Sequence, residues 1–306
     1  MTGTALDRRH MARALELAQR GLWTTDPNPR VGCVIAQGER VIAEGWHERA
    51  GGPHAEAMAL AAAGGPVRGA TAYVTLEPCC HYGRTPPCAD ALIAAGVQSV
   101  HYAVRDPNPR VSGGGVAKLE AAGIEVAGGL LAEEARALNQ GFLSRFERGR
   151  PWARVVVDEI PEQSTRLQWL RARSSAVLTG SGTVLARNPR LGVDLPDASR
   201  QPLRVVLDSR LAIPPSSHVL TGPGRLLVLT SCTDDGRRAT LERAGVCVEW
   251  LPAQPGGVDL AAVMRRLAEL EVNELQVEAG RRLTAAMLAA GLADELVGAD
   301  SLDNGH

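Results

Sequence analysis

The sequence has little lysine, few aromatic residues and almost no net charge. Of its 33 Lys and Arg residues only Lys118 is a lysine, and Phe, Trp and Tyr together make up 3% of the chain. With a formal net charge of −1, the composition gives no reason to expect nucleic acid or a membrane surface as a partner. No apolar run approaches the ~18 residues of a membrane-spanning helix, and the N-terminus lacks the apolar core of a secretory signal. We therefore expect a soluble cytoplasmic protein with aliphatic, Ala-rich cores.

A disulfide framework is also not expected. Six cysteines in 306 residues are few compared with the density in small secreted domains. In a reducing cytoplasm these thiols stay available to bind a metal. The length suffices for two domains. The polar run 147–151 predicts a linker between a first domain, residues 1–146, and a second domain, residues 151–306.

The strongest chemical signal lies between His54 and Cys88. Glu56 follows His54 at the second position, and Cys79 and Cys88 each follow a proline. One imidazole and two thiolates give zinc three ligands and leave one position for water, as in catalytic zinc sites. Glu56 would then act as the proton shuttle, as in zinc deaminases. A structural zinc site, or plain buried thiols, is the alternative interpretation.

Two neighbouring residues complicate the ligand set. Cys80 and His81 could each bind a metal on composition alone. Adjacent thiols rarely reach the same ion, so Cys80 is the weaker candidate, and we expect His81 to line the pocket instead.

Hydrophobic periodicity and turn residues predict alternating strands and helices in both halves. In the first half, strands are expected at 31–36, 41–46, 70–76, 97–104 and 124–127, and helices at 6–21, 53–65, 88–95, 116–122 and 132–146. In the second half, strands are expected at 153–157, 176–180, 204–207, 225–230, 246–250, 274–278 and 294–297, and helices at 166–173, 259–270 and 281–290. This alternation indicates layered α/β domains.

One pentapeptide, Asp-Pro-Asn-Pro-Arg, occurs twice, at 26–30 and 106–110. Asp, Asn and Pro are turn residues, so a pair of simple turns would explain it. Because both copies lie in the half that carries the zinc motif, we favour a shared role facing the substrate.

The first half resembles the deaminase domain of the bifunctional riboflavin-biosynthesis deaminase/reductase family. The resemblance covers nearly all of residues 8–146 and lies in His54-Ala55-Glu56, in 75–79 and in 81–88, with eight residues between the two cysteines. It implies a cytidine-deaminase-like, three-layer α/β/α domain that binds Zn²⁺. It also implies deamination of 2,5-diamino-6-(5-phosphoribosylamino)pyrimidin-4(3H)-one at the carbon bearing the 2-amino group.

The resemblance implies substrate contacts as well. Asn28 would hold the edge of the ring, and His47 and His81 would line the pocket. Three residues would bind the ribosyl phosphate end: Arg84, Asp106 and Asn108. A guanidinium is a good partner for phosphate, although each of these positions could also be an ordinary turn or surface residue. Cys80 stands where the family usually has Ser, which leaves the zinc motif intact.

The second half resembles the reductase domain of the same family, which has a dihydrofolate-reductase-like α/β fold and uses NADPH. The similarity lies in 179–186, 200–209 and 277–280. It implies five cofactor-binding residues: Gly180, Gly182, Thr183, Glu278 and Gly280. Three departures weaken it: 158–166 is far shorter than the family's substrate loop, Arg281-Arg282 replaces Pro-Thr, and the last strands of the sheet are missing.

These observations lead to one main hypothesis and three alternatives. The main hypothesis is a zinc-dependent riboflavin-pathway deaminase whose reductase domain is inactive. The alternatives are a working bifunctional enzyme that binds NADPH, a deaminase that serves a side pathway to another heterocycle, and a non-catalytic scaffold. The family also suggests a homo-oligomer formed through the second domain. The intact zinc motif argues against a scaffold for the whole chain.

Overall fold

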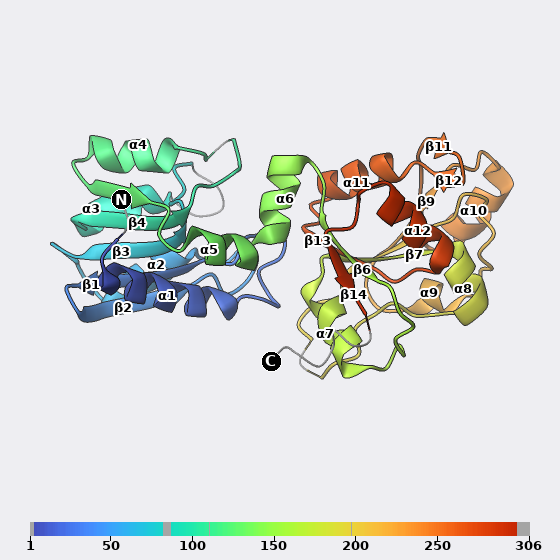
Figure 1. The fold of residues 1–306 in the computed structure, drawn as a ribbon, viewed down its shortest axis with the longest axis horizontal. Helices are drawn as coiled ribbons and strands as arrows, with labels where there is room; N and C mark the ends of the chain where they lie inside the picture. The colour runs from blue at the N-terminus through green and yellow to red at the C-terminus, as the bar shows by residue number, and fades with distance from the viewer. Residues whose placement is uncertain (1–2, 82–86, 110, 197, 299–306) are drawn as a thin grey trace. The chain divides into compact units, whose positions relative to one another are not determined.

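The computed structural model describes residues 3–81, 87–109, 111–196 and 198–298. The chain divides between Glu147 and Arg148 into two compact units, each built around its own sheet (Figure 1). The elements of the first unit are α1 (Ala5–Gln19), β1 (Gly32–Gln37), β2 (Arg40–Trp46), α2 (Ala55–Ala63), β3 (Thr71–Leu76), α3 (Cys88–Ala95), β4 (Ser99–Val104), α4 (Gly114–Ala121), β5 (Glu125–Gly128), α5 (Ala132–Leu138) and α6 (Gln140–Arg148), whose last residue already belongs to the second unit.

The first sheet has the order β2-β1-β3-β4-β5. β1 pairs antiparallel with β2 and β3, while β3, β4 and β5 run parallel. Leu76 and Val104, the last residues of β3 and β4, are paired neighbours. The segments that follow them therefore leave the sheet at the same edge, which is where ligands bind in open α/β sheets.

Helices cover both faces of this sheet. On one face, apolar residues of α1, α5 and α6 pack against the strands, among them Met11, Leu17 and Phe142. On the other face, α2, α3 and α4 contribute Ala59, Leu92 and Leu119. This is a three-layer α/β/α domain, and most of its fully buried side chains are aliphatic.

The single helix expected at 132–146 is two helices, α5 and α6, separated by Asn139. The side chain of Asn139 accepts a hydrogen bond from the Arg30 backbone N–H and donates one to the Arg30 carbonyl, both at 2.8 Å. Arg30 lies 109 residues away in the sequence. A long-range contact of this kind overrides the local helical pattern, so the prediction of one continuous helix is wrong.

The second unit contains β6 (Trp152–Val156), α7 (Thr165–Arg173), β7 (Ala176–Gly180), α8 (Ser181–Arg187), β8 (Leu203–Leu207), α9 (His218–Thr221), β9 (Leu226–Thr230), α10 (Asp235–Arg243), β10 (Cys247–Trp250), β11 (Ala253–Gln254), β12 (Gly257–Val258), α11 (Leu260–Glu269), β13 (Glu274–Val277), α12 (Arg281–Ala289) and β14 (Glu295–Val297). Its main sheet has the order β10-β9-β8-β7-β13-β6-β14, and its strand pairs are parallel.

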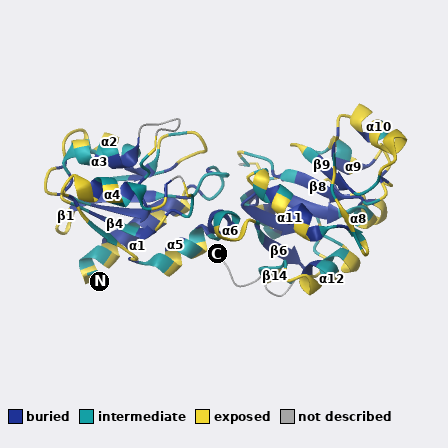
Figure 2. Ribbon diagram, turned by 90° about the horizontal axis from the view of Figure 1, so that it is seen from above, coloured by how far each residue is buried: buried dark blue, intermediate teal, exposed yellow. Residues whose placement is uncertain are grey.

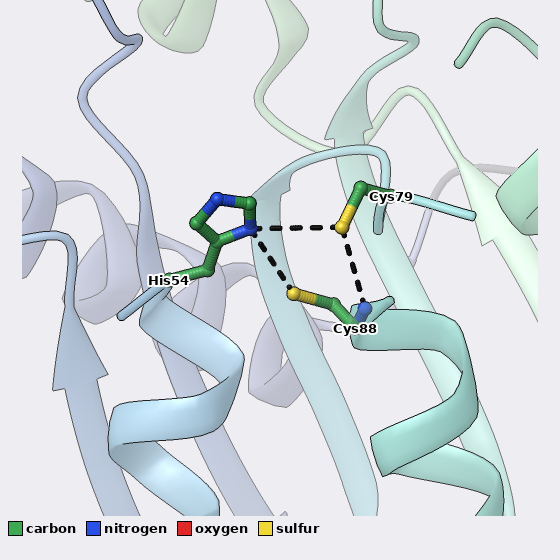
Figure 3. Close-up of side chains that lie close together, drawn as sticks. All are labelled: His54, Cys79 and Cys88. Carbon is green, nitrogen blue, oxygen red and sulfur yellow. Dashed lines mark hydrogen bonds between the residues drawn. The ribbon is translucent and has the colours of Figure 1, made fainter. Parts of the chain in front are cut away.

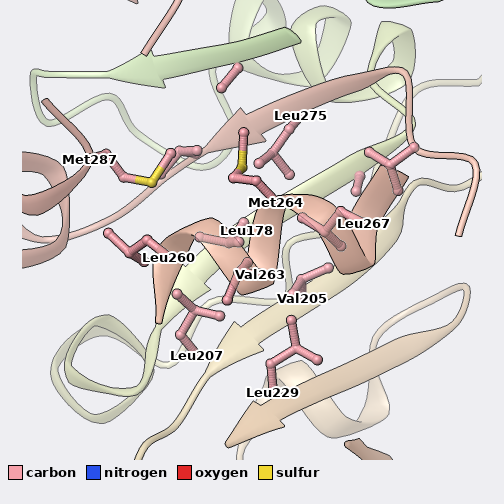
Figure 4. Packing of buried hydrophobic residues seen from close by; sticks show 14 of the residues in the cluster. Leu178, Val205, Leu207, Leu229, Leu260, Val263, Met264, Leu267, Leu275 and Met287 are labelled. Carbon is pink, nitrogen blue, oxygen red and sulfur yellow. The ribbon is translucent and has the colours of Figure 1, made fainter. Parts of the chain in front are cut away.

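Both faces of the central part of this sheet are buried, as in other parallel sheets, and its central strands are largely dark blue in Figure 2. On one face, Val263, Met264 and Leu267 of α11 pack against strand residues such as Leu178 and Val205 (Figure 4). The opposite face is covered by α8, α9 and α10. The structure therefore confirms an α/β second domain.

Five elements of the second unit were not predicted, namely the helices α8, α9 and α10 and the strands β11 and β12. α10 is polar along most of its length, and α9 has only four residues, so neither has a clear apolar period. Among the described residues, no helix has both the length and the apolarity that a membrane crossing requires.

Candidate functional site

Three metal-binding side chains meet in the first unit. The ligand atoms of His54, Cys79 and Cys88 all lie within 4.8 Å of one another (Figure 3). His54 Nδ1 lies 3.3 Å from Cys88 Sγ and 3.6 Å from Cys79 Sγ. The structure thus brings together the three residues expected to bind zinc, and no other such group is found among the described residues.

The spacing of these atoms fits zinc. With Zn–S bonds of about 2.3 Å and Zn–N bonds of about 2.0 Å, a tetrahedral ion holds its N and S ligands about 3.5 Å apart. The two measured N···S distances, 3.3 and 3.6 Å, are close to this value. One imidazole and two thiolates also balance the charge of the dication. The donor set is therefore suitable for zinc with one open coordination position.

Two helix starts position two of these ligands. His54 is the N-cap residue of α2 and stands just before the helix that was expected to contain it, and Cys88 is the first residue of α3. Gly45 of β2 allows α2 to pack closely, because a Cβ at this position would lie 2.4 Å from the Ala59 nitrogen. Cys79 does not stand at a helix start but follows β3 in the segment that leaves the sheet.

The thiols form a coupled pair. The pKa of Cys79 is lowered chiefly because Cys88 donates a hydrogen bond to its sulfur, and the His54 ring adds to the effect. The pKa of Cys88 is raised for the same reason, since it holds the shared proton. The backbone N–H of Cys88 also donates to Cys79 Sγ at 3.3 Å. The thiolate form is thus favoured at Cys79, while Cys88 would have to release the shared proton when zinc binds.

Glu56 lies beside these ligands. Its side chain is 97% buried, and burial raises its pKa to about 6, with the charge of Cys79 as a further cause. Glu56 is also close enough to Cys88 to form a side-chain hydrogen bond. Cys33 of β1 is completely buried nearby, and burial together with the charge of Glu56 raises the pKa of this thiol. A carboxyl group with a pKa near neutrality can both accept and return a proton.

Asn28 and His47 form a chain of hydrogen bonds next to His54. His47 Nδ1 lies 2.9 Å from the Pro53 carbonyl, and its Nε2 lies 3.1 Å from Asn28 Nδ2. A carbonyl only accepts, so Nδ1 carries the proton and Nε2 accepts from Asn28. Burial lowers the pKa of His47, which favours this neutral form. The His47 ring also contacts the His54 ring edge-on, with centroids 5.7 Å apart.

The second Pro-Asn-Pro copy approaches the same site from β4. Asp106 is buried and accepts a hydrogen bond from the Asn108 N–H at 2.8 Å. Burial raises the pKa of Asp106 to about 6, and among the smaller causes the charges of Glu77 and Cys79 raise it while that of His81 lowers it. Asp106, Cys79 and His81 are therefore close enough to interact electrostatically. Arg84, expected to bind phosphate, lies outside the described residues.

Sequence reasoning missed two groups that support this site. Asn139 fixes the first Pro-Asn-Pro copy through Arg30, as described above. Glu77 is buried between the cysteine-bearing segment and the second copy, and its carboxylate accepts hydrogen bonds from three backbone N–H groups. The glycine run 113–115 could have signalled an unusually close approach of two backbones, but the partner of that approach could not be read from the sequence.

In the second unit, four of the five expected cofactor residues lie together. Gly180, Gly182, Thr183 and Gly280 line a cavity of about 510 Å³, and the Gly280 N–H donates to Thr183 Oγ1 at 3.0 Å. Arg210, Arg281 and Arg282 line the same cavity. Glycine at 182 leaves open space above the backbone, since a Cβ there would meet nothing within 4 Å. These residues fit the phosphate groups of a dinucleotide such as NADPH.

Glu278, the fifth expected cofactor residue, faces a different cavity of about 460 Å³. Its carboxylate accepts two hydrogen bonds from Arg171, at 2.7 and 2.6 Å. Arg171 also donates to Glu162, and Glu162 accepts from the backbone N–H groups of Arg190 and Leu191 at 3.1 and 3.0 Å. The charged groups of this cavity are thus engaged with one another.

Comparison with known proteins gives matches over nearly the whole chain. Residues 4–104 match the family model for the cytidine and deoxycytidylate deaminase zinc-binding region, and residues 146–298 match that for the RibD C-terminal domain. The riboflavin biosynthesis protein RibD of Escherichia coli (strain K12) is 43% identical over 320 residues, which cover 95% of this chain and 86% of that protein.

Two solved structures are similar over the same extent. RibD of Acinetobacter baumannii is 40% identical, with a TM-score of 0.86, and the match covers 96% of this chain and 86% of that one. The Thermotoga maritima diaminohydroxyphosphoribosylaminopyrimidine deaminase/5-amino-6-(5-phosphoribosylamino)uracil reductase is 34% identical, with a TM-score of 0.82 and the same coverage. Both structures match across the division between the two units.

Proposed function

This chain belongs to the RibD family of riboflavin-biosynthesis deaminase/reductases, and on that premise we propose that its first unit is a zinc-dependent deaminase. The substrate we propose is 2,5-diamino-6-(5-phosphoribosylamino)pyrimidin-4(3H)-one, and the product is 5-amino-6-(5-phosphoribosylamino)uracil. One observation carries the proposal: three zinc-binding side chains lie within 4.8 Å of one another beside a buried carboxyl group. A cytoplasmic location accords with the reduced thiols of the site.

Zinc would be held by His54, Cys79 and Cys88. When bound, it makes the water in its open position acidic enough to lose a proton near neutral pH. The neutral His47 beside His54 supports this arrangement, because it keeps the ligand ring in place without adding a positive charge.

Glu56 would perform the proton transfers. It takes a proton from the attacking water and delivers it to the exocyclic amine nitrogen. A C–O bond forms and the C–N bond breaks, so that one water is consumed and one ammonia is released. The pKa of about 6 suits both roles, since the carboxylate accepts a proton and the acid returns it at similar free energy.

The two Pro-Asn-Pro loops would hold the rest of the substrate. Asn28 donates its amide N–H to His47 and can present its carbonyl oxygen to the edge of the pyrimidine ring. On the other side, Asp106 and Asn108 would contact the ribosyl phosphate end, and His81 would line the pocket with His47. Arg84 would be the phosphate partner, on the basis of its charge and its place in the motif.

The test is ammonia release by the zinc-loaded full chain supplied with this substrate. Glu56→Gln keeps the shape of the side chain and should lower turnover about 10²- to 10⁴-fold with an unchanged zinc content. Glu16→Gln, on an exposed part of α1, is the matched control and should leave turnover unchanged. No turnover by zinc-loaded wild-type protein, or full turnover by Glu56→Gln, would overturn the proposal.

For the second unit we infer that reductase activity is absent. Support comes from the cavity next to the cofactor residues, where the short segment before α7 places Asp158, Glu159 and Glu162 beside Glu278. Arg171 and Arg187 also line this cavity, but both are already paired with its carboxylates. The remaining excess of carboxylates repels a phosphorylated substrate. Oxidation of NADPH that depends on the deaminated product would establish the bifunctional alternative instead.

We also infer a homo-oligomer formed through the second unit. β14 is at the edge of its sheet, and Leu296 on this strand is 54% exposed. A sheet edge offers unpaired backbone groups to a second strand. Light scattering of the full chain should give a multiple of the 32.3 kDa chain mass, and Leu296→Lys should lower it. A monomer at all concentrations would contradict the inference.

A further inference from the structure

The Glu77 side chain is completely buried two residues before Cys79. Glu77 follows β3, and its backbone N–H donates to the Val104 carbonyl at 2.9 Å, which keeps it beside β4. Burial of a carboxylate is costly unless strong donors surround it. The donors that surround this carboxylate should therefore reveal its role.

Three backbone N–H groups donate to Glu77, and all come from one segment. Oε2 accepts from Gly113 at 3.1 Å and from Asp106 at 3.4 Å, and Oε1 accepts from Val116 at 3.4 Å. These donors span residues 106–116, from the second Pro-Asn-Pro copy to the first turn of α4. A negative charge at this place is favourable, because it lies near the N-terminus of that helix.

The same segment also contacts the residues on both sides of Cys79. A Cβ at Gly115 would lie 1.8 Å from the Pro78 carbonyl oxygen, and a Cβ at Gly114 would lie 2.5 Å from Cys80 Sγ. Only glycine allows backbones to approach this closely. Residues on both sides of Cys79 are therefore packed against the start of α4.

The segment also shapes the loop that carries Asp106 and Asn108. The Asn108 N–H donates to Asp106 Oδ1, and the Asn108 carbonyl accepts from Val111 and Ser112 at 2.8 and 2.9 Å. The Glu77 bonds to Asp106 and Gly113 lie at the two ends of this turn. A carboxylate that holds both ends of a loop fixes where the side chains of that loop stand.

We propose that Glu77 is a positioning residue of the deaminase. Its buried carboxylate holds the 106–116 segment against the residues around Cys79. This contact fixes Asp106 and Asn108 where they can bind the ribosyl phosphate end of the substrate. The inference rests on the proposed function of the first unit. Glu77 is not a catalytic residue, because its oxygens are occupied by backbone donors. Its effect on turnover is exerted through the loop.

Glu77→Gln is the direct test. The glutamine side chain has nearly the same size but only one acceptor oxygen. Its NH₂ group therefore points at no fewer than one of the backbone N–H groups, where donor faces donor. In the zinc-loaded full chain we expect KM for the phosphorylated substrate to rise about ten- to a hundredfold, the effect of losing a charge-assisted hydrogen bond. The value of kcat should change less than about threefold, and the zinc content should not change.

A substrate lacking the phosphate separates positioning from a purely structural role. If Glu77 acts through the ribosyl phosphate contacts, Glu77→Gln should raise KM much less for the dephosphorylated riboside than for the phosphorylated substrate. An equal rise for both, or a loss of zinc, would overturn the proposal.

A measurement without turnover keeps this test independent of the proposed reaction. Backbone amides in 106–116 should exchange hydrogen faster in Glu77→Gln than in the wild type, while those of α2 should be unchanged. Unchanged exchange in 106–116 would overturn the proposal whatever the enzyme acts on. Absence of ammonia release by the wild type would count against the proposed function alone.

Two glycine variants provide a matched pair in case Glu77→Gln folds poorly. Gly115→Ala forces a Cβ onto the Pro78 carbonyl and should reproduce the rise in KM and in exchange. Gly123→Ala, beyond the other end of α4, has φ +81° and meets nothing within 4 Å, so it adds only backbone strain. It should leave KM unchanged, and a similar rise in KM for both variants would contradict a specific role for the Pro78 contact.

Discussion

The two units use buried charged and polar groups in opposite ways. In the first unit, His54, Cys79 and Cys88 bond to one another and point at a common centre, with a protonatable Glu56 beside them. In the second unit, Arg171 is bonded by two carboxylates, and one of these, Glu162, also accepts from two backbone N–H groups. Ligand atoms that converge on one point, as these do, can hold a metal ion. An arginine already satisfied by carboxylates does not need a substrate.

Residue type alone therefore does not identify an active site. Both units carry ionisable residues of the kinds that enzymes use, and each unit matches a family model. What separates them is whether the buried groups converge on one point that a metal can occupy or form ion pairs with one another. We therefore expect substitutions of the zinc ligands or Glu56 to abolish deamination. Substitutions of Arg171 or its carboxylate partners should affect only the stability of the second unit.

The largest effect should come from the zinc ligands. Cys88→Ser should lose zinc and lower ammonia release more than about 10³-fold, because the acidified water is lost. Elemental analysis and an ammonia assay measure the two effects. Cys80→Ser is the matched control, since Cys80 is outside the cluster and should keep both zinc and turnover. Zinc retained by Cys88→Ser would contradict the ligand assignment.

The next effect should be a loss of stability in the second unit. Arg171→Met leaves the partly exposed carboxylates of Glu162 and Glu278 without their buried counter-ion. It should destabilise this unit by about 3 kcal/mol, the lower end of the range for a broken buried ion pair. Denaturant unfolding followed by circular dichroism measures the loss, while ammonia release should stay at the wild-type rate. Arg187→Met removes an exposed pair with Glu159 and should cost less than about 1 kcal/mol. A fall in ammonia release with Arg171→Met would contradict the conclusion that the ion pairs of Arg171 affect only the stability of the second unit.

A smaller effect should follow from Asn139→Ala in the first unit. Two hydrogen bonds to the Arg30 backbone would be lost, at a cost of about 1–3 kcal/mol in unfolding free energy. KM should rise as well, because Arg30 ends the loop that carries Asn28. Gln140→Ala, one residue further on, serves as the control. An unchanged KM would show that the first Pro-Asn-Pro copy holds its position without Asn139.

The smallest effect should be a dependence of stability on pH in the second unit. Burial alone would raise the pKa of Asp294, but hydrogen bonds from Arg150, Arg148 and the Ala153 N–H together keep it lowered in the folded state. Its stabilising contribution is therefore complete above the unfolded pKa of about 4 and is lost as the pH falls through the folded value. Asp294→Asn should be less stable than the wild type at pH 7, with the difference shrinking in acid. A constant difference would argue against ionisation as the cause.

Much of the first unit was predictable because its signals are local. The zinc motif, the hairpin and the strands β3 and β4 follow from short spacings and periodic apolar residues. The family assignment made from the eight-residue cysteine spacing is confirmed by the relatives that match.

The features that the sequence could not predict depend on contacts between distant residues. The break at Asn139 depends on Arg30, and the role of Glu77 depends on backbone groups up to 39 residues away. The Glu278 carboxylate lines the cavity next to that of the cofactor glycines, where it pairs with Arg171, 107 residues away in the sequence. No local pattern carries such information, since a side chain's partner is set by the sheet order.

The most direct test of the difference between the two units is an assay that follows deamination and NADPH oxidation together. Zinc-loaded full chain is mixed with the diaminopyrimidinone ribosyl phosphate and NADPH, and ammonia and NADPH absorbance are followed together. We predict one ammonia for each substrate consumed, with no oxidation of NADPH beyond the enzyme-free rate. Oxidation of NADPH in step with ammonia release, or no ammonia at all, would contradict the assignment of the chemistry to the first unit alone.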